Sequence, residues 1–256
     1  MIDLTKDLLI NILNEQFIPD HIFVYVAGGS INCFDGHKSY AFKSGEYFIA
    51  RKNRLARYKI ADDNFEPIMF CFDSTFLKNY SEENKINSSE FPSLDTFIKL
   101  KKNTLIKQFI KSLKPYYLAQ NTLDPAFADV KYEELLIILL KSQPELTKLL
   151  FDFGIPTKID LEKFMQKNYQ FNVSIARLAF LTGRSLSAFK RDFKTIFNDS
   201  PSHWLIQRRL EEAYFLISKQ KKKPSVVYLD LGFEDYSHFS FAFKKKFGVA
   251  PAALNL

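Results

Sequence analysis

The chain has 256 residues, of which 46% are hydrophobic and 25% charged, a composition typical of a globular protein large enough for two domains. No apolar run approaches the roughly 20 residues that a membrane span needs, and the N-terminal stretch lacks the basic start of a secretory signal. Cys33 and Cys71 form neither a metal-ligand spacing nor a disulfide framework, so we expect two buried free thiols in a cytoplasmic protein.

Positive charge is concentrated toward the C-terminus. Residues 160–256 carry 16 Lys and Arg against 9 Asp and Glu, whereas residues 1–159 carry 20 of each, so the net charge of +7 belongs to the C-terminal part. This asymmetry favours a polyanion as the partner of one domain. Charge alone leaves open whether that polyanion is DNA, RNA or lipid headgroups.

The segment from His21 to about Phe76 consists of short apolar or aromatic runs separated by Gly-Gly, Asp-Gly and Ser-Gly turn signals. This pattern predicts five or more strands, and their close spacing favours a small barrel or sandwich. The strand-rich segment contains aromatic side chains able to fill a small barrel, namely Phe23, Tyr25, Phe34, Tyr40, Phe42, Tyr47 and Phe48.

A polar stretch at residues 81–93 predicts a loop, and two helical stretches follow. Residues 94–113 keep an apolar stripe of helical period from Phe97 to Leu113. Residues 130–142 are apolar almost all round, so a helix there must be buried in a core or against a partner chain. We expect one domain over residues 1–156, with a barrel at about 20–80 and helices at about 94–153.

The remaining residues, 157–256, predict helices alone. A helix of about 18 residues begins at Ser200-Pro201-Ser202, because Pro is favoured in the first helical turn. Gly183 and Gly248 are predicted to end two other helices. Side chains suited to capping helix N-termini precede the other helical patterns, at Asp160, Ser174, Ser185 and Asp235.

An internal repeat organises this half. Each unit is a short helix, a turn containing Gly, an amphipathic helix and then Pro, which is the layout of a helix-turn-helix whose second helix reads the major groove. Tandem helical hairpins of scaffolding proteins share this layout. A shift of 50 residues superimposes Ser187 on Ser237, Phe189 on Phe239, Phe193 on Phe243, Phe197 on Phe247 and Pro201 on Pro251.

The stretch SLSAFKRDFKTIF at residues 185–197 separates apolar from polar side chains. Ser187, Lys190, Arg191 and Lys194 are predicted to face the groove. The connecting helix of about 18 residues is about 27 Å long, and two readers on one face of B-DNA lie about 34 Å apart. The apolar set is predicted to pack within its own unit, and consists of Leu186, Phe189, Phe193, Ile196 and Phe197.

These segments carry a family resemblance. The stretches FNVSIARLAFLTGRSLSAFKRDFKTIFNDSPSHWLIQRRLEEA and LGFEDYSHFSFAFKKKFGVAPAAL resemble the DNA-binding domain of AraC/XylS-type transcription regulators. In the N-terminal half, FKSGEYFIARKN, FCFDSTFL and EELLIILL resemble the sensor half of that family, and more closely its regulators of type III secretion. The resemblance implies an α+β protein of two domains, with an N-terminal cupin-like β-barrel, a helical dimerisation segment and a C-terminal all-α tandem helix-turn-helix.

The resemblance also implies which side chains meet DNA. The family's first reading helix touches bases from positions that fall on Ser187, Lys190 and Arg191, and Arg191 or Lys190 can donate to guanine O6 and N7. Lys245 is a candidate phosphate contact, and it is better placed than Lys246, for which a solvated basic helix end is an equally good explanation. The positions of the second reading helix fall on Tyr236, Ser237, His238 and Phe241.

Two positions depart from the family pattern. Phe241 stands where the family often has Arg, and it offers a base only apolar contact, for example with a thymine methyl group. Tyr228 stands four residues before Gly232, where the first unit has Ala179 and the family prefers a small residue. A tyrosine there is predicted to widen or tilt the helix crossing. We therefore expect the second unit to read sequence more weakly than the first.

Catalysis finds no support in the sequence. His21, His37 and Glu46 make a poor ligand set for zinc or iron, so no metal and no cofactor is expected. The motifs of serine hydrolases, P-loop proteins and dinucleotide-binding proteins are missing. A basic amphipathic helix lying on anionic lipid remains an alternative, but the repeated Phe face argues for a core.

The predicted function is a cytoplasmic, sequence-specific transcription regulator that binds double-stranded DNA as a homodimer, paired through helices at 97–113 and 131–141. The resemblance implies activation and contact with RNA polymerase. A signal in the barrel shifts the population between competent and incompetent arrangements. Two controls remain open, a small-molecule effector in an enclosed cavity and a regulatory protein on an exposed apolar patch.

Overall fold

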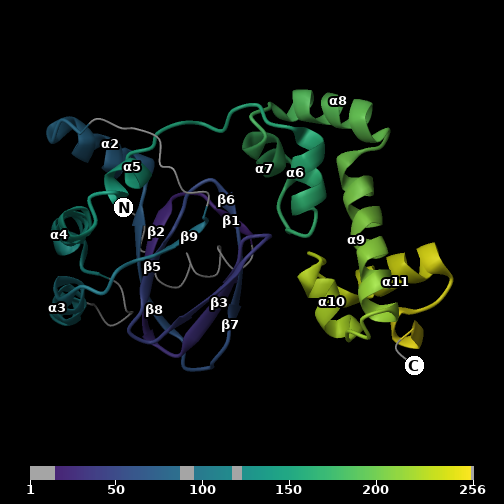
Figure 1. Cartoon of the computed structure of the whole chain (residues 1–256), viewed down its shortest axis with the longest axis horizontal. Helices are drawn as coiled ribbons and strands as arrows, with labels where there is room; N and C mark the ends of the chain where they lie inside the picture. Colours follow the sequence, from purple (N-terminus) through teal and green to yellow (C-terminus); the bar gives the residue numbers. More distant parts are fainter. Residues whose placement is uncertain (1–14, 87–94, 117–122, 255–256) are drawn as a thin grey trace. The chain divides into compact units, whose positions relative to one another are not determined.

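The computed structural model describes residues 15–86, 95–116 and 123–254. The chain divides into two compact domains, an N-terminal domain of residues 1–154 and a C-terminal domain of residues 155–256. The N-terminal domain combines strands with helices, and the C-terminal domain is helical in its described part, so the predicted α+β fold of two domains is confirmed (Figure 1). None of the helices in the described part is long and apolar enough to cross a membrane.

Antiparallel strands form the sheets of the N-terminal domain. One sheet has the order β8-β2-β5-β9, a second has the order β4-β3-β7, and β1 pairs with β6. Gly29 and Gly45 adopt positive φ angles of 65° and 82°, which supports the predicted Gly-Gly and Ser-Gly turns. The strands are β1 (Phe17–Ile18), β2 (His21–Gly28), β3 (Ser30–Phe34), β4 (Ser39–Lys43), β5 (Tyr47–Ala50), β6 (Arg54–Leu55), β7 (Arg57–Ile60), β8 (Glu66–Phe72) and β9 (Phe97–Lys99).

The four-stranded sheet is buried on both faces, because alternate side chains of each strand enter two different cores. On β2, Ile22 and Val24 point to the three-stranded sheet, while Phe23 points to the helices. On β5, Phe48 and Tyr47 divide in the same way. This double burial explains why β2 and β5 are nearly continuous apolar runs.

Aromatic rings fill the space between the two sheets. Phe42 stacks on Phe48 at a centroid distance of 3.9 Å, and Phe97 meets Tyr40 and Tyr58 edge to face at 5.1 and 5.6 Å. Phe42, Phe48 and Phe97 are each at most 2% exposed. The space between the two sheets is therefore occupied by the protein's own side chains.

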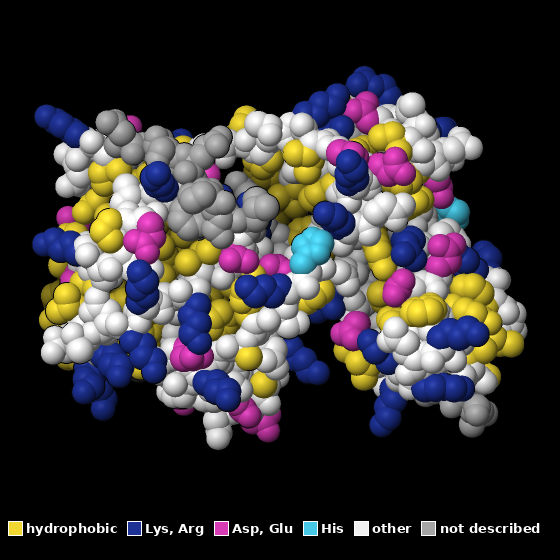
Figure 2. All heavy atoms as spheres, in the orientation of Figure 1, with side chains coloured by type: hydrophobic (Ala, Val, Ile, Leu, Met, Phe, Trp, Pro, Cys, Tyr) yellow, Lys and Arg dark blue, Asp and Glu magenta, His cyan; other side chains and the backbone are white. Residues whose placement is uncertain are grey.

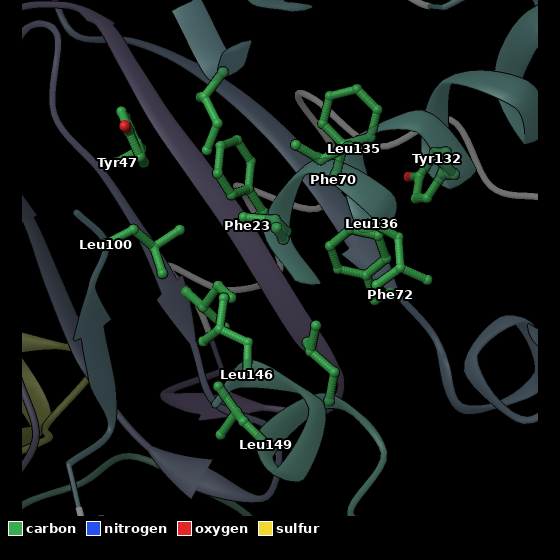
Figure 3. Close-up of a cluster of buried hydrophobic side chains, with 14 of the residues drawn as sticks. Phe23, Tyr47, Phe70, Phe72, Leu100, Tyr132, Leu135, Leu136, Leu146 and Leu149 are labelled. Atoms are coloured by element: carbon green, nitrogen blue, oxygen red, sulfur yellow. The ribbon is translucent and has the colours of Figure 1, made fainter. Parts of the chain in front are cut away.

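Helices cover the other face of the four-stranded sheet. Phe23 and Phe70 of the sheet meet Leu135 and Leu136 of α4 in one cluster, shown in Figure 3. The Tyr47 hydroxyl donates to the Lys101 carbonyl at 2.9 Å, which fixes the chain before α3. The helices are α2 (Ser74–Glu83), α3 (Thr104–Leu113), α4 (Pro125–Ser142) and α5 (Leu146–Leu150), with a 3₁₀ turn at Lys114–Tyr116.

Two sequence predictions for the N-terminal domain were wrong. Phe97–Lys99 is a strand and not the start of a helix, because it pairs with β5 and places Phe97 opposite Ala50. The barrel does not extend to residue 80, because Asp73 caps α2 by accepting from the amides of Thr75 and Phe76. The predicted loop at 81–93 begins after α2 ends, and its residues 87–93 lie outside the described residues.

The C-terminal domain contains the helices predicted for it, and their predicted N-caps are confirmed. The side chains of Asp160, Ser174, Ser185, Ser200 and Asp235 each accept a hydrogen bond from the first turn that follows. The helices are α6 (Leu161–Asn168), α7 (Ile175–Leu181), α8 (Leu186–Phe197), α9 (Pro201–Ser218), α10 (Pro224–Asp230) and α11 (Tyr236–Phe247), with a 3₁₀ turn at Pro251–Leu254.

Each helix-turn-helix has a core of its own. Phe189 and Phe193 of α8 lie in one cluster with Leu205 of α9, and Phe239 and Phe243 of α11 lie in another with Ala213 of α9. Helix α9 runs between the two units and contributes its N-terminal half to the first core and its C-terminal half to the second (Figure 1).

Candidate nucleic-acid interface

Helix α8 presents a polar, cationic face to solvent. Ser187, Lys190, Arg191 and Lys194 are all exposed, and at 3.6 residues per turn they fall within an arc of about 100°. Figure 2 shows Lys and Arg side chains gathered over this helix. The structure therefore brings the four predicted residues of the first unit to one surface.

The opposite side of α8 is buried only in the middle of the helix. Phe189 and Phe193 are fully buried, and the Trp204 ring meets Phe193 edge to face at 5.7 Å. Leu186 and Ile196 were predicted to pack within the unit, but they are 41% and 44% exposed. They lie in the first and last turns of α8, because this helix of 12 residues is longer than the core that it covers.

Helix α11 presents the corresponding surface of the second unit. The residues predicted to meet DNA, Tyr236, Ser237, His238, Phe241 and Lys245, are all exposed. Phe241 is 71% exposed, an unusual state for so large an apolar side chain. Where α8 offers a guanidinium at Arg191, α11 thus offers a phenyl ring.

One exposed cation of this surface was not among the predicted DNA contacts. Lys244 is exposed and lies 50 residues after Lys194, so it occupies the same place in the second unit, whereas Lys245 corresponds to Thr195. The repeat itself was the signal that could have found Lys244. Its neighbour Lys246 is engaged elsewhere, since its Nζ donates to the Gln207 carbonyl at 3.1 Å and to Glu211 Oε1 at 2.9 Å on α9.

Tyr228 is half-buried within the second unit. Its ring meets Tyr236 edge to face at a centroid distance of 5.4 Å and stacks on Phe239 at 6.3 Å. The equivalent Ala179 of the first unit is 2% exposed. The bulk of Tyr228 is therefore accommodated by contact with the start of α11, and the widened crossing stays a prediction.

One buried arginine ties the two units together, and the sequence analysis had not singled it out. Arg209 of α9 is 8% exposed and donates to the carbonyls of Tyr169 and Phe171, which follow α6, at 2.7 and 2.8 Å. It also donates to the Gly232 carbonyl in the turn of the second unit at 2.9 Å. These contacts fix the second turn against the start of the first unit.

Gly232 is required at this junction. It adopts φ +75°, and a Cβ atom there would lie 2.7 Å from the Gln170 carbonyl oxygen. The Asn172 side chain adds a hydrogen bond across the same junction, donating to Glu234 Oε1 at 2.8 Å. The two helix-turn-helix units are thus braced by hydrogen bonds as well as by α9.

A hollow of about 510 Å³ lies between α8 and the N-terminus of α9. Lys190 and Lys194 line one side, and Ser200 and Ser202 line the other. At its edge, the Asp199 carboxylate lies 2.6 Å from the His203 ring, and this hydrogen bond is the main reason why the pKa of Asp199 is lowered. The hollow has the cationic side chains and helix N-terminus that suit an anionic group.

The N-terminal domain contains residues of the types that can ligate a metal ion, among them His21, Cys33 and Cys71. Within residues 15–86, 95–116 and 123–254, no group of three or more His, Cys, Asp and Glu side chains is arranged to hold a metal ion. His21 is 1% exposed, and burial, with Lys52 and Arg51 nearby, lowers its pKa well below the usual value. The cysteines are free thiols, Cys33 buried and Cys71 half-buried, and burial raises the pKa of Cys71 to about 12.

Comparison with protein-family models gives a match for each half. The model described as the ExsA N-terminal regulatory domain matches residues 21–149. A model described as a helix-turn-helix domain matches residues 178–255, which include α8 and α11.

Individual relatives agree with the family models. The thermoregulatory protein LcrF of Yersinia pestis is 29% identical over 196 residues, covering 74% of this chain and 70% of LcrF. The virulence regulon transcriptional activator VirF of Yersinia enterocolitica is similar to the same extent, with 29% identity over 196 residues and the same coverage. A crystal structure of ToxT from Vibrio cholerae matches with 14% identity over 95% of this chain and 91% of ToxT, at a TM-score of 0.39.

Proposed function

The chain belongs to the AraC family of transcription regulators, and on that premise we propose that it activates transcription from promoters whose sequence it reads with α8 and, more weakly, with α11. One observation carries this proposal. Two helices related by a shift of 50 residues both bury Phe residues at equivalent positions and both turn the next face outward, and that face is cationic on α8. A helix of this kind fits the major groove.

In the first unit, Arg191 and Lys190 would donate to acceptors on base edges. Bidentate donation from Arg to guanine O6 and N7 discriminates against the wrong base by about 1–3 kcal/mol. Ser187, near the start of α8, would approach the bases from the helix N-terminus. Lys194 would lie closer to the DNA backbone, because it is one turn further from the N-terminus of α8 and the N-terminal residues of a recognition helix are those that contact base edges.

In the second unit, Ser237 and His238 offer hydrogen bonds to bases, and Phe241 offers apolar contact with a thymine methyl group. Tyr236 lies on the same exposed end of α11. Lys245, joined by Lys244, would bind phosphates, which adds affinity without sequence preference. The second unit would therefore anchor the protein one helical turn from the site that α8 reads.

The N-terminal domain would pair two chains through α3 and α4. Leu105 of α3 is 50% exposed, and Phe127 and Val130 of α4 are 43% and 64% exposed, although both helices bury their other faces in the core. Exposed apolar side chains on neighbouring helices suit a dimer interface. Sedimentation should give a dimer for the natural chain and a monomer for a Leu105→Asp, Val130→Asp variant. A variant that stays dimeric would refute this interface.

Control by a partner protein is favoured over control by a small molecule. The support is the filled interior between the sheets, where Phe42, Phe48 and Phe97 leave the barrel to its own side chains. Native mass spectrometry of protein purified from its own host should give the mass of the chain without an organic adduct. A small molecule retained by the N-terminal domain would instead favour the ligand-sensing alternative.

The activator proposal extends to the cell. A cytoplasmic protein without a catalytic role, acting on RNA polymerase at its promoters, is consistent with relatives that are transcription regulators. DNA fragments crosslinked to the protein in its host should include promoters whose transcripts fall when the gene is deleted. Transcripts that rise instead would mean repression, and an absence of enriched fragments would refute DNA regulation under the condition tested.

A further inference from the structure

The segment that leads into α6, residues 155–160, lies against the turn of the first helix-turn-helix. Gly183 of that turn adopts φ +64°, and a Cβ atom there would lie only 2.3 Å from the backbone of Thr157 and 2.5 Å from that of Lys158. The Ile159 amide donates to the Thr182 carbonyl at 3.4 Å. Because this contact is between backbones, the segment is part of the first unit and not a free tether.

Arg184 fastens this segment to both sides of the turn. Its side chain is 7% exposed, and Nη1 donates to the carbonyls of Ile159 at 2.9 Å and Thr182 at 2.8 Å. Its Nε donates to Asp192 Oδ2 on α8 at 3.1 Å. A single buried guanidinium thus connects the incoming chain, the turn and the reading helix.

Asp192 carries the connection onward to the exposed face of α8. Its Oδ2 also lies 3.8 Å from Lys158 Nζ, and its Oδ1 lies 3.5 Å from Arg191 Nη2. The hydrogen bond from Arg184 is the main cause that lowers the pKa of Asp192, and Lys158 and Arg191 lower it further. The carboxylate is therefore ionised at neutral pH and shared between the incoming segment and Arg191.

The second unit lacks this arrangement. The residue 50 positions after Asp192 is Ala242, and the residue 50 positions after Arg191 is Phe241. An anionic partner is present where the reading face has an arginine and missing where it has a phenylalanine. Arg184 also has no counterpart there, since residues 233 and 234 are Phe and Glu, so the carboxylate occurs in the unit that has both of the arginines it contacts.

From these contacts we infer that Asp192 is a positioning residue for Arg191, through which residues 155–160 and the turn of the first unit set the direction of the base-reading guanidinium. The inference rests on the proposed base contact of Arg191. The Arg191 side chain is 77% exposed, so without an anchor it would be spread over many rotamers. An anchored guanidinium loses less conformational freedom when it meets a base, and it presents its donors in a defined plane.

The test measures base discrimination by the full chain. The probes are the preferred duplex from a randomised library and duplexes with single base-pair changes. Asp192→Asn should reduce discrimination about tenfold at the base pairs that Arg191→Ala also affects, and leave it unchanged elsewhere. Its affinity for unrelated duplexes should stay equal or rise, because an anion has been removed. Asp192→Glu should retain most of the discrimination.

A second pair of variants guards against a loss of folding. Lys158→Ala removes one cation from Asp192 but leaves the hydrogen bonds of Arg184 intact, so a smaller change at the same base pairs is expected. Lys163→Ala is the matched control, since its side chain is 82% exposed and pairs with Asp160 instead. It should leave discrimination unchanged.

The outcomes separate the two ideas. If Arg191→Ala leaves discrimination intact, the proposed base contact is wrong and the inference falls with it. If Arg191→Ala removes discrimination but Asp192→Asn changes nothing, or weakens all base pairs equally, the positioning role alone is overturned. In an Arg191→Ala background, Asp192→Asn should cause no further loss.

Discussion

The two helix-turn-helix units share a backbone plan and differ in what they offer to a ligand. Both recognition helices have 12 residues, begin at a side-chain N-cap and end at a left-handed residue, Asn198 or Gly248. The first exposes Lys190, Arg191 and Lys194, whereas the second exposes Phe241 and its lysines. The buried half of the repeat is thus alike in the two units, whereas the exposed half differs, with cations on α8 and with a phenyl ring and lysines on α11.

The largest effect is expected from removing the reading cations of the first unit. A Lys190→Ala, Arg191→Ala variant should lose about 100-fold or more in discrimination between the preferred duplex and an unrelated one, because each good base contact contributes about 1–3 kcal/mol. Fluorescence anisotropy at constant salt measures this. Lys167→Ala, on the exposed part of α6, is the control, and equal losses in both variants would contradict a specific role for α8.

The next largest effect is expected from Arg209, which braces the two units. Arg209→Met should lower the free energy of unfolding by about 2–4 kcal/mol, because three carbonyl groups lose a charged donor. Thermal unfolding measures this loss. The variant should also tolerate changed spacing between the two half-sites better than the natural chain. A variant that keeps both its stability and its strict spacing would show that α9 alone holds the units in place.

Phe241→Arg should sharpen the second unit. The change restores the residue that the family often has at this position, so discrimination at one base pair should rise about five- to tenfold. The control is Phe241→Ala, which should change discrimination by less than about threefold, because an apolar contact contributes less than a bidentate hydrogen bond. If both variants behave alike, α11 does not approach the base edges.

The smallest effect distinguishes two adjacent lysines. Lys244→Ala should reduce the slope of log K against log salt by about 0.9, the loss of one phosphate contact. Lys246→Ala should leave the slope unchanged, because its ammonium group is held by Gln207 and Glu211. Binding titrations at several salt concentrations measure both slopes. Equal slopes for the two variants would mean that the contacts on α9 are exchanged for phosphate on binding.

The C-terminal domain could be predicted nearly element by element from the sequence. Its signals are local, since capping side chains, Gly or Asn ends and the spacing of Phe residues act within one or two turns. The register of the repeat also placed Ser187, Lys190, Arg191 and Lys194 on one exposed face. Exposure of Leu186 and Ile196 was missed, because the length of the core under a helix is not visible in its own periodicity.

The N-terminal domain was predicted less completely, because part of its structure depends on contacts between residues that are far apart in the sequence. Residues 97–99 form a strand only because β5 lies open beside them, and no local pattern records that pairing. The role of Arg209 was hidden for a related reason. A buried arginine in a helix looks like a surface residue until the three carbonyls that it satisfies are brought together by the fold.

The proposed division between reading by α8 and anchoring by α11 can be tested by selecting a randomised duplex library with the purified protein at near-physiological salt. The difference between the two units predicts a motif with one strongly specified half-site and, about one helical turn or 34 Å away, a weakly specified second one. Enrichment of two equally strong half-sites would contradict the division between reading and anchoring. A library from which nothing is enriched, with retention that vanishes as salt is raised, would contradict sequence reading by α8 itself.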